Sequence, residues 1–223
     1  ISYLWSLEVM NKGGKKMNVS EQQLVTKQFY KNFVDNEEMH PVEVLGEAYS
    51  KEQEKEIYDL SYIRFAQGEV YFHSKDYESA IFKWENIHNE LSPWAKKNMA
   101  DAYFKLGIYK NAEELYLSIE EKSTLLDTDI EFRLFQLYEQ QQIFDKAEDH
   151  IKKAIFLDPD YPSVTEKARL FFEERENWKN AVELAVSEGM RTSSEEWFSH
   201  FIRYVEKKVI GDFEPRDFKD FIV

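Results

Sequence analysis

The sequence predicts an all-α fold built from repeated pairs of helices, with a helical cap at each end. Glycine and proline together supply only 12 of the 223 residues (7 and 5), which leaves few positions for tight turns and favours uninterrupted helix. A spacing of small and aromatic residues also recurs about every 34 residues, which is typical of helical repeats. With 43% hydrophobic and 16% aromatic residues, the chain can bury a sizeable core.

The first stretch, residues 1–16, ends in "NKGGKK" before Met17. A phosphate-binding loop of the Walker type is excluded, because the glycine–lysine pair at 14–15 is followed by another lysine and not by Ser or Thr. One interpretation is an N-terminal helix followed by a glycine hinge. The other is a translated leader: residues 12–14 can be encoded by the purine tract that bacterial ribosomes recognise, which makes Met17 the native start and the source bacterial.

Residues 17–60 are predicted to form an N-terminal helical cap on the first repeat. Ser20 and Gln23 form a capping box ahead of "LVTKQFYKNFV". A second box, Ser50 with Gln53, is expected to start a long helix that enters the first repeat. The apolar stripe expected along the first helix consists of Leu24, Phe29, Phe33 and Val34.

Four repeats are predicted over residues 61–190, with approximate ranges of 61–92, 93–127, 128–161 and 162–190. In each, two aromatic residues are followed by an alanine, and successive alanines are 32, 35 and 34 residues apart. Small residues such as Gly68 and Ala100 let two helix backbones approach closely, while the aromatic residues fill the space between repeats. The recurring sets are Tyr71, Tyr77 and Ala80; Tyr103, Tyr109 and Ala112; Tyr138, Phe144 and Ala147; and Phe172, Trp178 and Ala181.

This pattern resembles the tetratricopeptide repeat, in which small, aromatic and alanine positions recur on a helix-turn-helix unit and a proline ends the second helix. Pro159 and Pro162 stand at that proline position in the third repeat. The resemblance implies a right-handed α-solenoid of stacked helix-turn-helix (TPR-like) repeats, whose inner wall is built from the first helix of each repeat. Repeat one has Ser92 and then Pro93 around this position, and repeat two has Thr124 there. Repeat four has Arg169 where a small residue is usual, and is expected to act as a cap.

The family's groove positions, carried over to this sequence, imply a partner-binding surface. An aromatic and mixed-charge surface suits a peptide or helix whose apolar anchors enter between the phenylalanines. The alternative is that these aromatic residues pack between helices or are covered by the chain's own tail. The predicted groove residues are Tyr62, Phe65, Glu69, Phe72, His73, Trp94, Lys97, Asp101, Phe104, Lys105, Phe132 and Gln136, with Asp129, Glu139 and Gln140 beside them.

One subfamily of these repeats grips a C-terminal carboxylate through lysine and asparagine at fixed groove positions. Here Phe65 and Glu69 occupy those places, and only Asn98 and Arg133 fit, so this carboxylate clamp is not expected. His73 is expected to be an ordinary polar groove residue, with a pH-sensitive contact as the alternative.

Residues 191–223 are predicted to form a C-terminal capping helix and a tail. The helix falls on "SSEEWFSHFIRYVEKKV", with Trp197, Phe201, Tyr204 and Val205 on one side. The tail "IGDFEPRDFKDFIV" either folds back onto the helices through its phenylalanines or begins a further domain beyond Val223.

Charge and composition argue against several classes of function. A net charge of −14 without a basic run is unsuited to nucleic acid. The absence of cysteine excludes a disulfide framework and a thiolate metal site, and fits a cytoplasmic protein. No apolar run reaches the roughly 18–20 residues that span a bilayer. Five scattered histidines and the lack of a Gly-x-Ser-x-Gly elbow predict no metal, no cofactor and no catalytic residue.

Residues 112–149 carry 11 acidic against 3 basic side chains, a local balance of −8. This acidic stretch either selects a basic partner or is a solvated surface that keeps the protein soluble.

The sequence therefore predicts a non-catalytic scaffold that holds a peptide or helix of a partner protein in its groove. The alternative is a regulatory arm of a larger polypeptide or complex whose enzymatic part lies outside this chain. Self-association, with one copy's groove receiving another copy's tail, is a third interpretation.

Overall fold

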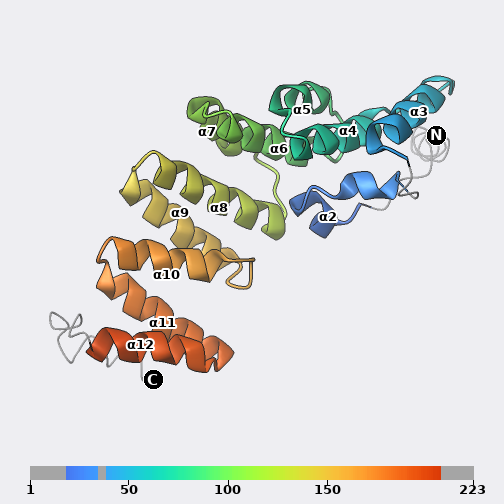
Figure 1. Ribbon diagram of the computed structural model, residues 1–223. Helices are drawn as coiled ribbons and strands as arrows, with labels where there is room; N and C mark the ends of the chain where they lie inside the picture. Colours follow the sequence, from blue (N-terminus) through green and yellow to red (C-terminus); the bar gives the residue numbers. More distant parts are fainter. Residues whose placement is uncertain (1–18, 35–38, 207–223) are drawn as a thin grey trace, which may run out of the picture. The chain divides into compact units, whose positions relative to one another are not determined.

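The computed structural model describes residues 19–34 and 39–206, and within these ranges all regular structure is helical (Figure 1). The predicted all-α class is confirmed. The predictions for residues 1–16, as a leader or as a helix with a hinge, for a start at Met17 and for the tail at residues 210–223 lie outside the described residues. Within the described ranges, none of the helices is both long and apolar enough to cross a membrane.

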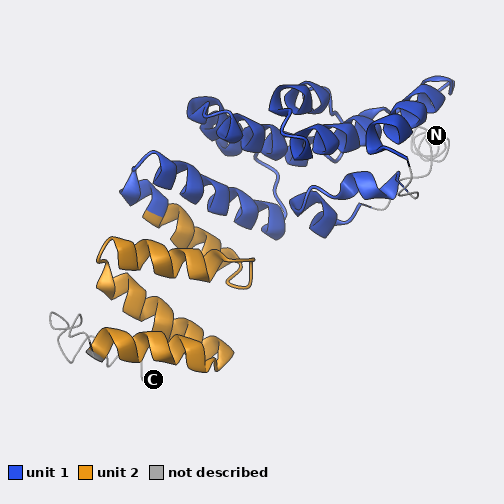
Figure 2. Ribbon diagram, viewed as in Figure 1, with its two compact units in different colours: residues 1–147 blue, residues 148–223 orange. Residues whose placement is uncertain are grey.

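The chain divides into two compact units, residues 1–147 and 148–223 (Figure 2). Within the described residues, unit 1 starts with two short helices and continues with helical pairs in which α4 packs on α5 and α6 packs on α7. In sequence order its helices are α2 (Glu21–Val25), the 3-10 helix η1 (Phe29–Asn32), α3 (Pro41–Gln53), α4 (Ser61–His73), α5 (Tyr77–Trp84), α6 (Ser92–Lys105), α7 (Tyr109–Leu117), α8 (Thr124–Gln140) and the start of α9 (Phe144–Leu157).

Unit 2 holds the rest of α9, followed by α10 (Val164–Glu174), α11 (Trp178–Thr192) and α12 (Glu195–Glu206). Helix α10 packs on α11, and α11 packs on α12. Arg169 is buried and forms ion pairs with Glu166 and Glu173. Arg203 of α12 lies 2.6 Å from the same Glu173 carboxylate, which links α10 to α12.

The four predicted pairs share one turn, which explains their aromatic spacing. In each, the residue two positions after the end of the first helix has a positive φ: Lys75, Gly107, Gln142 and Glu176. The next N–H donates to the carbonyl of the first recurring aromatic residue, five positions earlier, at 2.8–3.0 Å (the carbonyls of Tyr71, Tyr103, Tyr138 and Phe172). This is the Schellman arrangement that closes a helix. The second helix then starts at the second aromatic residue of each set, Tyr77, Tyr109, Phe144 or Trp178.

Close helix contact is visible at Gly68 in α4. A Cβ atom built there would lie 2.3 Å from Nε1 of Trp84, which donates a hydrogen bond to the carbonyl of Phe65 at 3.0 Å. The predicted role of this glycine, to let two helices approach, therefore matches the packing. The alanines at 80, 112, 147 and 181 are fully buried. The third pair starts at Thr124, four residues before the predicted limit at 128.

The N-terminal predictions were partly wrong. The first helix ends at Val25, because Lys27 adopts a left-handed conformation (φ 53°) that closes the helix, and the Ser20 side chain makes no capping hydrogen bond. Ser50 does not start a helix: it lies inside α3, where its hydroxyl donates to the carbonyl of Gly46. Because α3 ends at Gln53 and α4 begins at Ser61, no long helix runs into the first pair.

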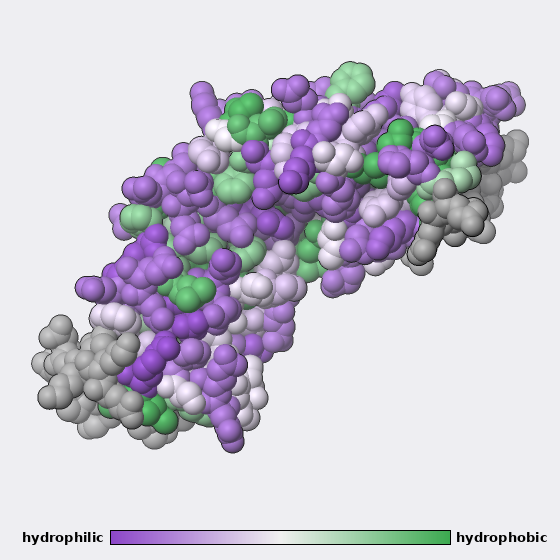
Figure 3. Space-filling model, viewed as in Figure 1, coloured by the Kyte–Doolittle hydropathy of each residue, from purple (hydrophilic) through white to green (hydrophobic). Residues whose placement is uncertain are grey.

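The visible surface in Figure 3 is mostly hydrophilic, with apolar side chains in small separate groups. Phe82, Leu117 and Phe156 are examples of exposed apolar residues. Scattered residues of this kind are normal on a protein surface and do not indicate a binding patch.

Candidate functional site

The predicted groove residues of unit 1 lie on α4, α6 and α8, and we call the surface that they form the groove face. Residues 19–34, which we call the N-terminal segment, lie against this face, with η1 on α4 and α2 beside α8 (Figure 1). Phe29 is fully buried there. Its ring centroid lies 5.6 Å from that of Phe65 and 6.3 Å from that of Tyr62. The segment belongs to residues 17–60, which were predicted to form a helical cap on the first repeat, and it covers part of the groove face.

Two residues of α4 hold the backbone of the N-terminal segment. The N–H of Tyr30 donates to Oε2 of Glu69 at 2.7 Å. His73 Nε2 lies 2.7 Å from the carbonyl oxygen of Lys27, and because a carbonyl only accepts, this nitrogen carries the proton. These contacts use main-chain atoms of the segment and do not depend on its side chains.

The Lys27 side chain enters a socket in the groove face. Its Nζ lies 2.5 Å from Oδ2 of Asp101 and 4.7 Å from the centroid of the Phe72 ring. Both charged side chains are almost fully buried. Burial lowers the pKa of Lys27 to about 8, although the nearby Asp101 carboxylate acts in the opposite direction. The Phe72 ring and the carboxylate together define a site for a cation.

A buried ion-pair network continues from this socket across α6 and α8. Lys97 has 0% exposure and lies 3.3 Å from Asp101 and 2.7 Å from Asp129. Arg133 Nε lies 3.3 Å from Asp129. Burial alone would raise the pKa of Asp101, but Lys27 and Lys97 outweigh it and hold that pKa far below its ordinary value. The network stays ionised because each carboxylate faces at least two cations.

Glu69 is a fully buried acid of the groove face, with 0% exposure, as is Asp129. Burial raises its pKa to about 8, even though backbone N–H groups of Tyr30 and Phe29 act to lower it. Within the described residues its Oε1 atom has no hydrogen-bond partner. The carboxyl is therefore mostly protonated at neutral pH while the N-terminal segment covers it.

One part of the groove face stays open as a cavity of about 310 Å³, which we call the Phe104 cavity. Phe72 and Phe104 give it apolar walls, and Lys105, Glu139 and Gln140 add polar groups. It therefore combines apolar area with both signs of charge, as a peptide site needs. The complete lining is Lys27, Phe72, Asp101, Phe104, Lys105, Arg133, Gln136, Glu139 and Gln140.

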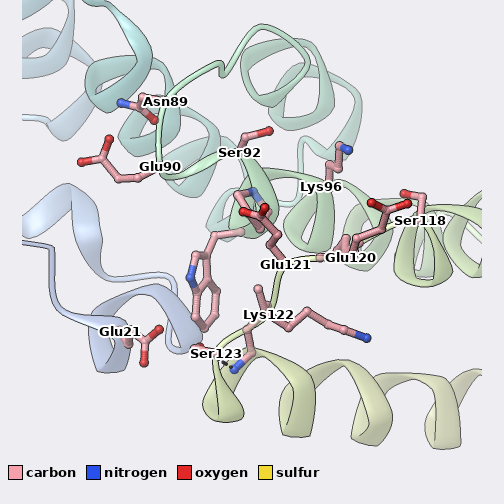
Figure 4. A pocket seen from close by; sticks show the side chains of 14 residues that line it. Glu21, Asn89, Glu90, Ser92, Lys96, Ser118, Glu120, Glu121, Lys122 and Ser123 are labelled. Atoms are coloured by element: carbon pink, nitrogen blue, oxygen red, sulfur yellow. Dashed lines mark hydrogen bonds between the residues drawn. The ribbon is translucent and has the colours of Figure 1, made fainter. Parts of the chain in front are cut away.

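A second cavity of unit 1, of about 790 Å³, lies at the other end of the N-terminal segment and is shown in Figure 4. Glu21 of α2, Glu90 before α6 and Glu120 and Glu121 before α8 face it, while Lys96 and Lys122 are its basic residues. We call it the acidic cavity. The last two glutamates belong to the predicted acidic stretch, so part of that stretch borders a cavity.

The structure divides the predicted groove residues into three sets. Phe72, Asp101, Phe104, Lys105 and Gln136 line the Phe104 cavity, with Glu139 and Gln140. Tyr62, Phe65, Glu69 and His73 contact the N-terminal segment, and Phe72 and Asp101 do so as well through Lys27. Trp94 borders the acidic cavity, while Lys97, Asp129 and Phe132 are buried.

Sequence reasoning therefore overestimated how much of the groove face is accessible. Phe65, Glu69 and Lys97 are not open to a partner, because the N-terminal segment or the ion-pair network covers them. It also missed Lys27 as part of the site. The available signal was a lysine placed between the apolar residues Leu24 and Phe29 of a predicted stripe.

The described residues contain no group of three histidine, cysteine or carboxylate side chains that could hold a metal ion. No protein-family model matches the sequence, and no curated protein matches it. The resemblance to tetratricopeptide repeats accordingly stays a prediction from the residue pattern.

Proposed function

We propose that this protein is a non-catalytic protein-interaction scaffold that binds a peptide or helix of a partner protein on its groove face. In this proposal the helical pairs continue as a right-handed α-solenoid of TPR-like repeats, and the protein acts in the cytoplasm. The four equivalent turns at Lys75, Gly107, Gln142 and Glu176 support the repeat interpretation.

The observation that carries the proposal is that the groove face already holds a peptide segment. Glu69 and His73 bind the segment's backbone, while Asp101 binds a lysine and Phe65 a phenylalanine. A surface that binds one stretch of chain through both main-chain and side-chain contacts has the features that peptide recognition requires.

The Phe104 cavity is an accessible part of this surface. Phe72 and Phe104 can receive an apolar anchor, and desolvated aromatic pockets of this kind supply much of the affinity of peptide complexes. Lys105 and Gln140 are exposed at its edge, where charge and hydrogen bonding orient a ligand more than they strengthen its binding.

A phage-displayed library of random peptides, selected against the full chain, tests the proposal. We expect selected peptides to bind the wild type and to lose at least about tenfold in affinity, or about 1.4 kcal/mol, on Phe104→Ala. Phe82→Ala is the matched control, because this phenylalanine is 65% exposed on α5 and does not line the cavity. Failure to select any peptide, or equal binding by both variants, would contradict the proposal.

A further inference from the structure

The N-terminal segment makes two kinds of contact with the groove face. The backbone contacts, from Lys27 to His73 and from Tyr30 to Glu69, can be made by any peptide in the same conformation. The side-chain contacts select chemistry: a cation at position 27 and an aromatic ring two residues later at position 29.

The socket for the cation belongs to the groove face itself. Asp101 and Phe72 come from α6 and α4, and both remain in place whichever chain supplies the ammonium group. Without Lys27, Oδ2 of Asp101 loses its nearest cation, at 2.5 Å, and keeps only the more distant Lys97 at 3.3 Å, while the Phe72 ring that faced the ammonium group remains beside it. An empty socket therefore favours a new cation over an anion or an apolar group.

The seat for the aromatic ring lies beside that socket. Phe65 and Tyr62 surround Phe29 from α4, and Phe65 packs in turn against Trp84 at 6.4 Å between ring centroids. Because Trp84 is anchored to the α4 backbone, the seat is held by the helical pair and not by the segment. It would suit the ring of another peptide equally well.

The N-terminal segment is held mainly by these anchors, since its own local structure is weak. Its helices are only five and four residues long, below the length at which an isolated helix is stable. Lys27 also adopts a left-handed conformation, with φ 53°, which is strained for any residue other than glycine. Lys27 also forms part of the wall of the Phe104 cavity, so a peptide bound there adjoins the segment directly.

We propose that residues 19–34 are an exchangeable internal ligand that occupies the seat of a partner peptide, and that this peptide presents a cation followed two residues later by an aromatic side chain. The inference rests on the proposed function and adds the chemistry of the partner and a means of regulation. The segment competes from within the chain, at an effective concentration of about millimolar, so only partners that outcompete it gain access.

Binding of a labelled peptide to the full chain tests the exchange. The probe is a fluorescein-labelled synthetic peptide with the sequence of residues 20–34, "SEQQLVTKQFYKNFV". We expect the double variant Lys27→Ala, Phe29→Ala to bind it at least about tenfold more tightly than the wild type does, because the internal competitor is weakened. The matched control is Gln28→Ala, Lys31→Ala, which changes two exposed residues of the same segment and should bind like the wild type.

The chemistry is tested with a second peptide in which the lysine and phenylalanine are replaced by alanine. It should bind the double variant at least about tenfold more weakly than the first peptide does. If the double variant loses its helical circular dichroism signal, Lys27→Met replaces it, because methionine keeps the aliphatic part of the lysine side chain. This variant is also expected to bind the first peptide more tightly than the second.

The inference is overturned if the wild type, the control and the double variant Lys27→Ala, Phe29→Ala bind the first peptide equally. If library-selected peptides still lose affinity on Phe104→Ala when the first peptide binds all three proteins equally, the proposed function stands and only the exchange of residues 19–34 is contradicted. If no library peptide binds through Phe104 either, the proposed function and the exchange are both contradicted. Light scattering tests for self-association. A wild-type dimer that disappears in the double variant would identify the occupant as a second copy of this chain, and this result also overturns the assignment to a partner peptide.

Discussion

The buried charges of the groove face show how single residues limit what the sequence reveals. Lys97 and Asp101 occupy predicted groove positions, yet they lie in an ion-pair network that other residues cover. Periodicity identifies which face of a helix a residue occupies, but not what lies over that face. The covering side chain, Lys27, is 74 residues away from Asp101 in the sequence.

Glu69 makes the stability of the protein depend on pH. Its pKa in the folded protein, about 8, lies above the ordinary value of 4.5. Between these two pH values the folded protein therefore holds a proton on Glu69 that the unfolded chain has lost. Its contribution to stability is complete below about pH 4.5 and is lost as the pH rises towards about 8. We expect the free energy of unfolding of the wild type to fall, relative to Glu69→Gln, by about 3 kcal/mol between about pH 5 and about pH 7.5.

Urea denaturation of both proteins at several pH values measures this difference, in which other titrating groups cancel. Glutamine resembles the protonated acid, so the two proteins should have similar stability at the acidic end. A difference that is independent of pH would show that Glu69 does not titrate in this range.

At the scale of the elements, the turn between the two helices of each pair is the feature that the sequence predicts best. The aromatic residues that recur in the sequence are those whose carbonyls close the first helix and those that start the second. Local hydrogen bonding and packing set this pattern, so it can be read from residue spacing. The N-terminal segment could not be placed in the same way, because its position depends on tertiary contacts.

The turns also predict a stabilising substitution. Gln142 has φ 59°, a conformation that glycine adopts without strain, and Gly107 already occupies the equivalent position of the preceding turn. Gln142→Gly should raise the free energy of unfolding by roughly 0.5–1 kcal/mol.

Gln141→Gly is the matched control for this substitution. Its φ of −86° gives glycine no conformational advantage, so the change should lower stability. Urea denaturation compares the two variants, and a loss of stability in Gln142→Gly would show that this turn does not take the left-handed form.

At the scale of the whole molecule, charge complements the groove chemistry. The net charge of −14 and the glutamates of the acidic cavity attract basic peptides, and this attraction raises association rates most strongly at low salt. A partner that carries a cation for the Asp101 socket therefore fits the molecule's overall charge as well as the local site.

The central claim is that the groove face of unit 1 is a peptide-binding surface that residues 19–34 occupy when no partner is bound. Hydrogen exchange of the full chain, with and without a library-selected peptide, tests it most directly. We expect that, compared with the free chain, the peptide-bound chain shows faster amide exchange in residues 24–33 and slower exchange in α6. Unchanged exchange in residues 24–33, with peptide-dependent protection confined to other surfaces, would contradict it.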